Sequence, residues 1–443
     1  MGVMIMVGQL VLSLSILIVL HEMGHFLPAR LFDTRVEKFY LFFDPWFSLF
    51  KVQKGETEYG IGWLPLGGYV KISGMIDESL DKEQMKQPPQ PWEFRSKPAW
   101  QRLIIMLGGV TVNFILGFLI FGMVLGIWGE KFIPNEAVTD GIFVDSLGMQ
   151  IGLQDGDMVL GVDTIAFEEF GDRELFYQLV INKPEKINIK RDGRKTSLPV
   201  PAGIDQVLAT KENKGKSLYG PRMPFIIGSF PAKNKPSPGR DAGLQVKDKI
   251  VSIDGVETQY YHEFKNEVQG KGGQSVNVGV VRDRDSINYD ITLTDAGTVG
   301  IFATSLDSLF GVQTRSYTAA QALPAGFDKG VKFLGDQFKA WGKMFRRDIS
   351  VKDNLGGFRA FATLFGTTWD WERFWNMTAI ISLILAFMNL LPIPALDGGH
   401  VMFLLYEVVT GRKPSDQFME YATIVGFVLV LSLVIYANYL DWF

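Results

Sequence analysis

The sequence predicts an α-helical membrane protein with four transmembrane helices, a membrane-associated β-loop and two extracytoplasmic α+β domains. The chain has 443 residues, of which 47% are hydrophobic, and the apolar residues are concentrated in four long stretches. The segment between the second and third stretches contains an internal repeat, as expected of two small domains in tandem. Basic residues cluster in two of the connections and predict the orientation of the helices.

Four segments are long and apolar enough to cross a bilayer. They comprise residues 3–26, 103–128, 374–391 and 421–436. The fourth is short, but Tyr421 and Tyr436 stand at its ends, where aromatic side chains favour the membrane surface. Gly122 and Gly126 in the second segment allow close contact between helices. Core helices of a large soluble protein remain an alternative, mainly for the third and fourth segments.

The distribution of Lys and Arg predicts the orientation of these segments. The connection 27–102 carries eleven basic residues, the connection after the third segment adds Arg412 and Lys413, and both chain ends carry none. Because positive charge marks cytoplasmic loops, we expect both termini and the long connection after the second segment to be extracytoplasmic.

The sequence HEMGH, residues 21–25, stands at the end of the first apolar segment. In a helix, His21 and His25 project from the same face, so their imidazoles can bind one metal ion. Glu22 stands beside them, where a carboxylate can activate a metal-bound water. A structural histidine pair is the alternative, but ionisable groups at membrane depth are costly and mostly functional. The motif therefore favours peptide-bond hydrolysis at or inside a membrane.

The third apolar segment ends in NLLPIPALDGGH, residues 389–400. The first and third segments must cross in the same direction, so their ends emerge on the same side. The two prolines stop the helix and the glycines permit a tight turn that can aim Asp397 at the histidines. Two histidines and one carboxylate leave a fourth position open, as in catalytic zinc sites. His400 competes with Asp397 as the third ligand.

The repeat consists of GLQDGDMVLGVD at residues 152–163 and GLQVKDKIVSID at residues 243–254, and 243 − 152 gives an offset of 91 residues. Each copy predicts a turn, a short strand, a second turn, a helical patch and further strands. This pattern resembles PDZ domains, which bind extended peptides by strand addition. The chain has no clear match to the glycine loop by which PDZ domains bind peptides. The two domains could therefore either bind peptides or act as a rigid filter that excludes large substrates.

Together these motifs resemble the bacterial site-2 proteases, in particular the regulator-of-sigma-E protease type with tandem PDZ domains. The resemblance covers nearly the whole chain. It implies a Zn²⁺ site at His21, His25 and Asp397, with Glu22 polarising the water. It also implies a multi-pass protein of the bacterial inner membrane. Its expected substrates are single-span membrane proteins, such as anti-sigma factors already trimmed outside in envelope stress signalling, and remnant signal peptides.

Residues 59–72 are apolar, partly alternating, and turned by proline and glycine. They look like the family's membrane-associated β-loop, whose edge could pair with the backbone of an unwound substrate. Gly67, Gly68 and Tyr69 are therefore candidate substrate contacts, and an ordinary surface hairpin is the alternative. Asn389 could hold the substrate or stabilise an oxyanion, or serve as a structural cap. Asn113 matches a family position whose role is less clear.

A helix with one apolar stripe is predicted after the repeats. The stripe consists of Phe327, Val331, Leu334, Phe338, Trp341 and Phe345. We expect this helix at the outer membrane surface or packed on the second PDZ-like domain.

The chain thus divides into five regions. They are an N-terminal transmembrane half with the HExxH motif and β-loop (1–128), a first PDZ-like domain (129–220), a second (221–305), an amphipathic interfacial helix with a linker (306–372), and a C-terminal transmembrane half with the LDG motif (373–443).

Composition and Glu22 weigh against other function classes. A zinc transporter or a non-catalytic PDZ scaffold would not need a carboxylate beside the two histidines. The net charge of −4 gives no reason to expect a nucleic-acid partner. The absence of cysteine excludes disulfides and thiolate metal sites.

Overall fold

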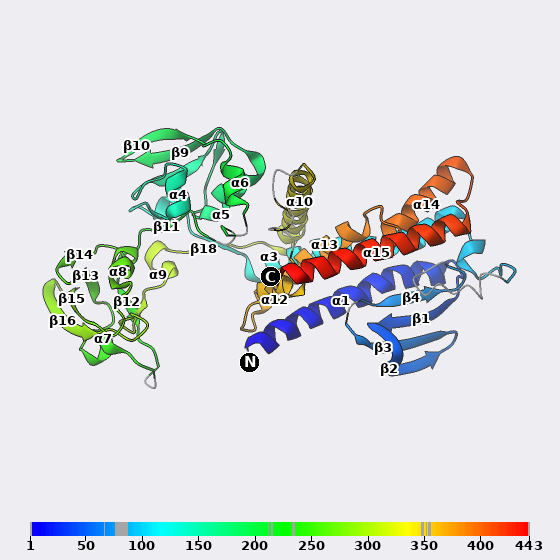
Figure 1. Ribbon diagram of the computed structural model, residues 1–443, viewed down its shortest axis with the longest axis horizontal. Helices are drawn as coiled ribbons and strands as arrows, with labels where there is room; N and C mark the ends of the chain where they lie inside the picture. Colours follow the sequence, from blue (N-terminus) through cyan, green and yellow to red (C-terminus); the bar gives the residue numbers. More distant parts are fainter. Residues whose placement is uncertain are drawn as a thin grey trace. The chain divides into compact units, whose positions relative to one another are not determined.

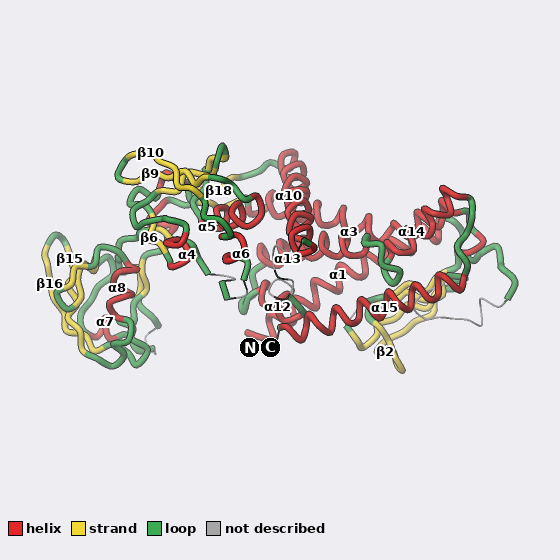
Figure 2. Tube along the Cα trace, turned by 45° about the horizontal axis from the view of Figure 1, so that its top comes forward, coloured by secondary structure: helices red, strands yellow, loops and turns green. Residues whose placement is uncertain are grey.

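The computed structural model describes residues 2–65, 67–75, 87–210, 212–213, 216–232, 235–346, 350, 352 and 356–441. The chain forms two compact units. We call residues 1–129, 316–338 and 355–443 the helical unit, and residues 130–315 and 339–354 the strand-rich unit. Figures 1 and 2 show the helices and strands of each.

The helical unit contains one helix for each predicted transmembrane segment. Its helices are α1 (Gly2–Leu31), α3 (Ala99–Trp128), α10 (Ala319–Phe345, which continues into the strand-rich unit), α12 (Phe358–Phe365), α13 (Trp371–Asn389), α14 (Asp397–Thr410) and α15 (Asp416–Leu440), with a short turn η1 (Phe94–Ser96). Among the described residues, α1, α3 and α15 are long and apolar enough to cross a membrane. The third predicted span, α13, is shorter and has Glu372 in its first turn, so its transmembrane placement stays a prediction.

Helix α3 is the centre of this bundle and contacts α1, α13 and α14. Gly24 of α1 faces Gly108 of α3, and a Cβ on either glycine would run into the backbone of the other. Such small residues let two helices approach closely. Ser13 of α1 and Thr378 of α13 share a buried hydrogen bond of 2.9 Å. The start of α1 and the end of α15 lie at the same end of the unit (Figures 1 and 2).

Helix α10 packs on the bundle within the helical unit. Phe327 contacts Phe118 of α3, and Phe338 contacts Phe387 of α13, with ring centroids 4.9 and 4.7 Å apart. Part of its apolar stripe stays exposed, including Val331 at 47%. An exposed apolar stripe on a helix suits the predicted position at a membrane surface.

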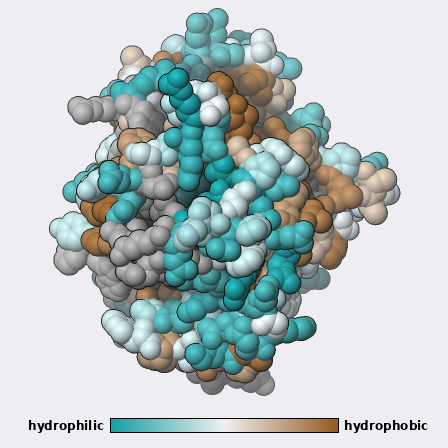
Figure 3. Space-filling view, turned by 90° about the vertical axis from the view of Figure 1, so that its right-hand side faces the viewer, coloured by the Kyte–Doolittle hydropathy of each residue, from teal (hydrophilic) through white to brown (hydrophobic). Residues whose placement is uncertain are grey.

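A four-stranded sheet completes the helical unit. Its strands are β1 (Val36–Leu41), β2 (Phe43–Lys54), β3 (Thr57–Leu64) and β4 (Tyr69–Ile72), in the order β2-β3-β1-β4. β1 and β3 are parallel, and β4 is an edge strand antiparallel to β1. The predicted β-loop covers only β3 and β4, so the sheet is larger than the sequence pattern indicated. Hydrophilic side chains cover most of the end of the unit seen in Figure 3, with hydrophobic ones in smaller patches.

The strand-rich unit contains two modules with the same sheet order. The first module has β5 (Glu130–Phe132), η2 (Asn135–Ala137), β6 (Ile142–Val144), α4 (Ser146–Gln150), β7 (Met158–Val162), β8 (Ile165–Ala166), α5 (Asp172–Tyr177), η3 (Gln178–Asn182), β9 (Lys186–Arg191), β10 (Arg194–Pro199), α6 (Ile204–Leu208) and β11 (Tyr219–Pro221). The second has β12 (Ile227–Ser229), α7 (Pro238–Asp241), β13 (Lys249–Ile253), β14 (Val256–Glu257), α8 (Tyr261–Val268), β15 (Ser275–Arg282), β16 (Asp285–Thr292) and β17 (Phe302–Ala303), followed by α9 (Leu306–Phe310) and β18 (Gln313–Arg315).

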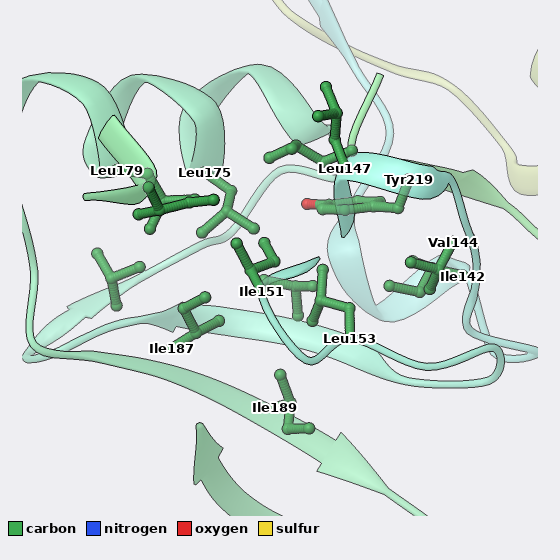
Figure 4. Close-up of a cluster of buried hydrophobic side chains, with 14 of the residues drawn as sticks. Ile142, Val144, Leu147, Ile151, Leu153, Leu175, Leu179, Ile187, Ile189 and Tyr219 are labelled. Carbon is green, nitrogen blue, oxygen red and sulfur yellow. The ribbon is translucent and has the colours of Figure 1, made fainter. Parts of the chain in front are cut away.

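The two sheets run β10-β9-β7-β8 and β14-β13-β15-β16. Strand β7 begins at Met158 and β13 at Lys249, and 249 − 158 again gives 91 residues. Figure 4 shows the core of the first module, where Leu175 and Ile187 are fully buried. Alternate apolar residues of the strands meet those of the helices there, as the predicted α+β pattern requires.

Each module also carries the same ionic clamp. Arg191 donates two hydrogen bonds of 2.8 Å to Asp157, and Arg282 donates two of 2.6 Å to Asp248. In both cases the guanidinium also donates to the backbone carbonyl of a glycine, Gly152 or Gly243. Bidentate Arg–carboxylate pairs hold a fixed geometry, so each clamp ties a turn to its sheet.

Candidate metal centre

Three side chains converge beside the C-terminal third of α1, which continues past both histidines to Leu31. His21 Nε2 lies 3.3 Å from His25 Nε2 and 3.3 Å from Asp397 Oδ2, and His25 Nε2 lies 3.5 Å from the same oxygen. Ligand atoms about 2.0 to 2.1 Å from a tetrahedral zinc lie about 3.3 to 3.4 Å from one another. The three spacings therefore fit three corners of a zinc tetrahedron and leave the fourth corner open.

The hydrogen bonding of Asp397 also fits a bound metal ion. In the described part of the chain, Asp397 Oδ2 is buried and has no hydrogen-bond donor. A buried carboxylate oxygen without a donor is costly unless a cation balances it. The donor set of two imidazoles and one carboxylate suits Zn²⁺.

The turn between α13 and α14 places Asp397. Helix α13 ends at Asn389, and α14 begins at Asp397, at a helix N-terminus that favours a negative charge. Gly398 and Gly399 pack so closely on this turn that a Cβ on either would run into backbone carbonyls of residues 390–393. The glycines of the LDGG sequence therefore let the turn fold tightly beneath the carboxylate.

Helix α3 supports the two histidines from behind. His25 Nδ1 lies 2.8 Å from the carbonyl of Ile105, and His21 Nδ1 lies 3.1 Å from the amide of Asn113. Gly109 lies between them, and a Cβ there would lie 2.6 Å from His21 Cε1 and collide with the imidazole of His25. Sequence reasoning missed Gly109 and Ile105. The signal for Gly109 was its spacing of four residues from Asn113, which puts both on one face of α3.

Most of the remaining predicted residues line a cavity of about 500 Å³ around the group, namely Glu22, Gly68, Tyr69, Asn389 and His400. Glu22 is 9% exposed and faces this cavity without belonging to the three-ligand group. Asn389 Nδ2 lies 3.3 Å from His21 Nε2, and Asn389 lines the same cavity. His400 also lines the cavity, but it is outside the group that could hold the ion.

The β4 end of the sheet forms another part of the cavity wall. Gly68 and Tyr69 line it, and a Cβ on Gly68 would lie 3.4 Å from the side chain of Glu22. Gly67 is outside the lining and packs near the ring of Phe43. Tyr69 donates a hydrogen bond of 2.9 Å to Asp44, which fixes its ring beside the cavity.

Comparison with known proteins gives a consistent result. The sequence pattern of peptidase family M50 matches residues 9–433. The regulator of sigma E protease of Haemophilus influenzae is 28% identical over 98% of this chain and 98% of its own length. The regulator of sigma-E protease of Escherichia coli is also 28% identical, with 98% of both chains covered. A Vibrio cholerae relative, 27% identical over 98% of this chain and 97% of its own, has a name containing the words zinc metalloprotease.

Proposed function

This chain belongs to peptidase family M50, and we propose that it hydrolyses peptide bonds in or near transmembrane segments of single-span proteins. It is a zinc metalloprotease of the site-2 type. The observation that carries the proposal is the spacing of His21, His25 and Asp397, with both histidines on an apolar helix long enough to cross a membrane.

Each residue of the site has a chemical role in this proposal. His21, His25 and Asp397 hold Zn²⁺, which would polarise the scissile carbonyl and acidify a bound water. Glu22 accepts the proton of the attacking water and passes it to the leaving amine. The amide of Asn389, which lines the cavity 3.3 Å from His21 Nε2, donates to the carbonyl oxygen as negative charge develops on it.

Strand β4 is suited to present the substrate. It is an edge strand, and residues 68–72 line the cavity. A transmembrane helix must unwind before its carbonyls can be attacked, and unwound backbone in lipid needs hydrogen-bond partners. Pairing with β4 supplies these partners and places the unwound segment beside Glu22.

The setting of the enzyme follows from the charge distribution and the relatives' names. We place it in a bacterial inner membrane with both termini outside and the metal site toward the cytoplasm. Because two relatives are named regulators of sigma E, we propose anti-sigma factor-like substrates, and remnant signal peptides as a second class.

The two modules of the strand-rich unit are proposed to be extracytoplasmic PDZ-like domains. A cavity of about 1350 Å³ lies against β6 and α8, lined by Phe143, Phe264 and Phe302 among others. A cavity beside a helix and a strand suits an extended peptide, and a space lined by both modules also suits a size filter.

The test is cleavage of a tagged single-span substrate by the purified protein in detergent. We expect Glu22→Gln to reduce cleavage by about 10³-fold while bound zinc is retained, because a general base contributes about 10²–10⁴-fold. A zinc chelator should abolish cleavage, and Glu257→Gln, at an exposed position of β14, should change nothing.

Two results would contradict the proposal. Chelator-resistant cleavage, or full activity of Glu22→Gln, would exclude this mechanism. If zinc binds but no substrate is cleaved, metal flux in vesicles would favour a transporter, and peptide binding without cleavage would favour a scaffold.

A further inference from the structure

The two histidines of the metal centre are held by different kinds of acceptor. His25 Nδ1 faces the backbone carbonyl of Ile105 at 2.8 Å, whereas the contact of His21 Nδ1 in the described part of the chain is with the side-chain amide of Asn113, at 3.1 Å. Substitution cannot remove a backbone carbonyl, but it can remove a side-chain amide. The orientation of His21 therefore depends on a replaceable residue.

Asn113 is placed for this contact by its own packing. It is 1% exposed, lies in the middle of α3, and its backbone carbonyl accepts a hydrogen bond of 2.8 Å from Ser382 of α13. Within the described residues, its Oδ1 is buried and has no donor. A buried amide oxygen without a donor, beside an imidazole nitrogen, indicates that the pair is completed in another state of the site.

The state that completes the pair follows from the geometry of His21. Its Nε2 faces His25 and Asp397, so Nε2 must offer its lone pair to a metal ion. A neutral imidazole then carries its only proton on Nδ1, which needs an acceptor. A rotation of the Asn113 amide by half a turn about χ2 brings Oδ1 to Nδ1, because amide oxygen and nitrogen occupy nearly equivalent positions.

We propose that Asn113 is a positioning residue whose amide oxygen accepts the Nδ1 proton of His21 and thereby fixes the tautomer that binds zinc. The proposal rests on the metal site of the proposed function. Acceptors behind metal-bound histidines orient the ring and raise its basicity, and their loss typically weakens metal binding by about 10- to 100-fold.

The experiment measures zinc affinity of the purified full-length protein in detergent, by competition with a chromogenic chelator. Asn113→Leu keeps a side chain of similar size but removes the acceptor, and we expect about 10- to 100-fold weaker zinc binding. Asn113→Asp restores an acceptor, and we expect affinity at or above that of the unaltered chain. Ser382→Ala, which loosens the backbone of Asn113 without touching its amide, is the matched control and should retain affinity.

Two further readouts separate positioning from packing. The melting temperature of the zinc-free protein should be similar in the Leu and Asp variants. With ¹⁵N-labelled histidine, the zinc-loaded unaltered chain and the Asp variant should show the Nδ1-protonated form of His21, assigned by its loss in His21→Gln. Unaltered affinity in Asn113→Leu, or equal losses in the Leu and Asp variants, would overturn the proposal.

The same measurements distinguish a failure of the proposed metal site from a failure of the proposed role of Asn113. A chain that binds no zinc, or whose affinity is unchanged by His21→Gln, would overturn the metal site and this proposal together. Zinc binding that depends on His21 but not on residue 113 would overturn only the role of Asn113.

Discussion

In the helical unit, the buried polar groups of the metal centre come from three separate helices and face one another with incomplete hydrogen bonding. Asp397 Oδ2 and Asn113 Oδ1 both have no hydrogen-bond donor among the described residues. In the strand-rich unit, the most buried carboxylates are fully paired. Asp157 and Asp248 are 0% and 1% exposed, and each accepts three hydrogen bonds, two of them from an arginine.

This difference distinguishes buried polar groups that stabilise the fold from buried polar groups that can bind a ligand. A buried charge whose bonds are all satisfied within the fold stabilises that fold, and it repeats at the same offset in both modules. A buried charge left unsatisfied by the fold is available to a ligand. Four predictions can break or sharpen this comparison.

The largest effect is expected at Gly109. A Cβ there would collide with the imidazole of His25 and lie 2.6 Å from His21 Cε1, so Gly109→Ala should displace both rings. We expect zinc affinity to fall by at least about 100-fold, since the site tolerates little misplacement of its ligands. The control is Gly8→Ala on α1, where a Cβ would meet nothing within 4 Å. Equal zinc binding by both variants would show that the site is not confined by α3.

The second-largest effect is expected when the ionic clamp of each module is broken separately. Asp157→Asn removes the charge that pairs with Arg191, and Asp248→Asn does the same for Arg282. Breaking a buried ion pair costs about 3 kcal/mol, which is about a 100-fold increase in local opening. Amide hydrogen exchange in the full-length protein should rise in β7 and β9 for the first variant and in β13 and β15 for the second. Exchange that rises in both modules for either variant would mean that the modules unfold as one.

The clamp of the second module should also fail in acid. Burial raises the pKa of Asp248, but hydrogen bonds from Arg282 and the Gln245 backbone outweigh it and hold the pKa below the ordinary value of 3.8. The folded state therefore binds a proton less readily than the unfolded state. Its stabilisation is complete above pH 3.8 and is lost as the pH falls toward the lowered value.

The smallest effect is expected at the contact between the modules. His262 of α8 stacks on Phe143 of β6, with ring centroids 4.7 Å apart. Among the described residues both of its buried ring nitrogens lack a hydrogen-bond partner, and Nε2 lies 3.9 Å from Asp155 Oδ2. Burial lowers the pKa of His262 below 6.5; Glu263 and Asp155 oppose this shift, while Arg222 adds to it. Tyr260 also stacks with the ring, with ring centroids 5.9 Å apart.

The direction of the pH dependence of this contact follows from the lowered pKa of His262. Because the packed form has the lower pKa, the contact is strongest above pH 6.5 and weakens as the pH falls through that value, when the released imidazole takes up a proton. The chain has no cysteine, so spin labels on Lys195→Cys and Asp285→Cys can report the distance between the modules. We expect the distance distribution to broaden from about pH 7 to about pH 5 in the unaltered background, and to stay constant in His262→Gln. Broadening in both would assign the effect to another group.

Much of the architecture could be predicted from the sequence because it depends on local periodicity. Apolar length predicts α1, α3 and α15, and the repeat at residues 152 and 243 predicts two modules whose strands start 91 residues apart. The spacing of His21 and His25 places both on one helix face without any knowledge of the fold. The sheet of the helical unit was only half predicted, since β1 and β2 mix polar and apolar residues without the alternation that marks a strand.

The tertiary structure decided the contacts between residues that are far apart in the chain. Sequence alone determined that two histidines and a glutamate lie within two turns of one helix, because helical geometry is local. It could propose Asp397 from topology, but the spacings of 3.3 and 3.5 Å depend on how the turn at residues 390–396, near the other end of the sequence, packs against α1. The support from Ile105, Gly109 and Asn113 was decided in the same way, because these residues act only once α3 crosses α1 at Gly24 and Gly108.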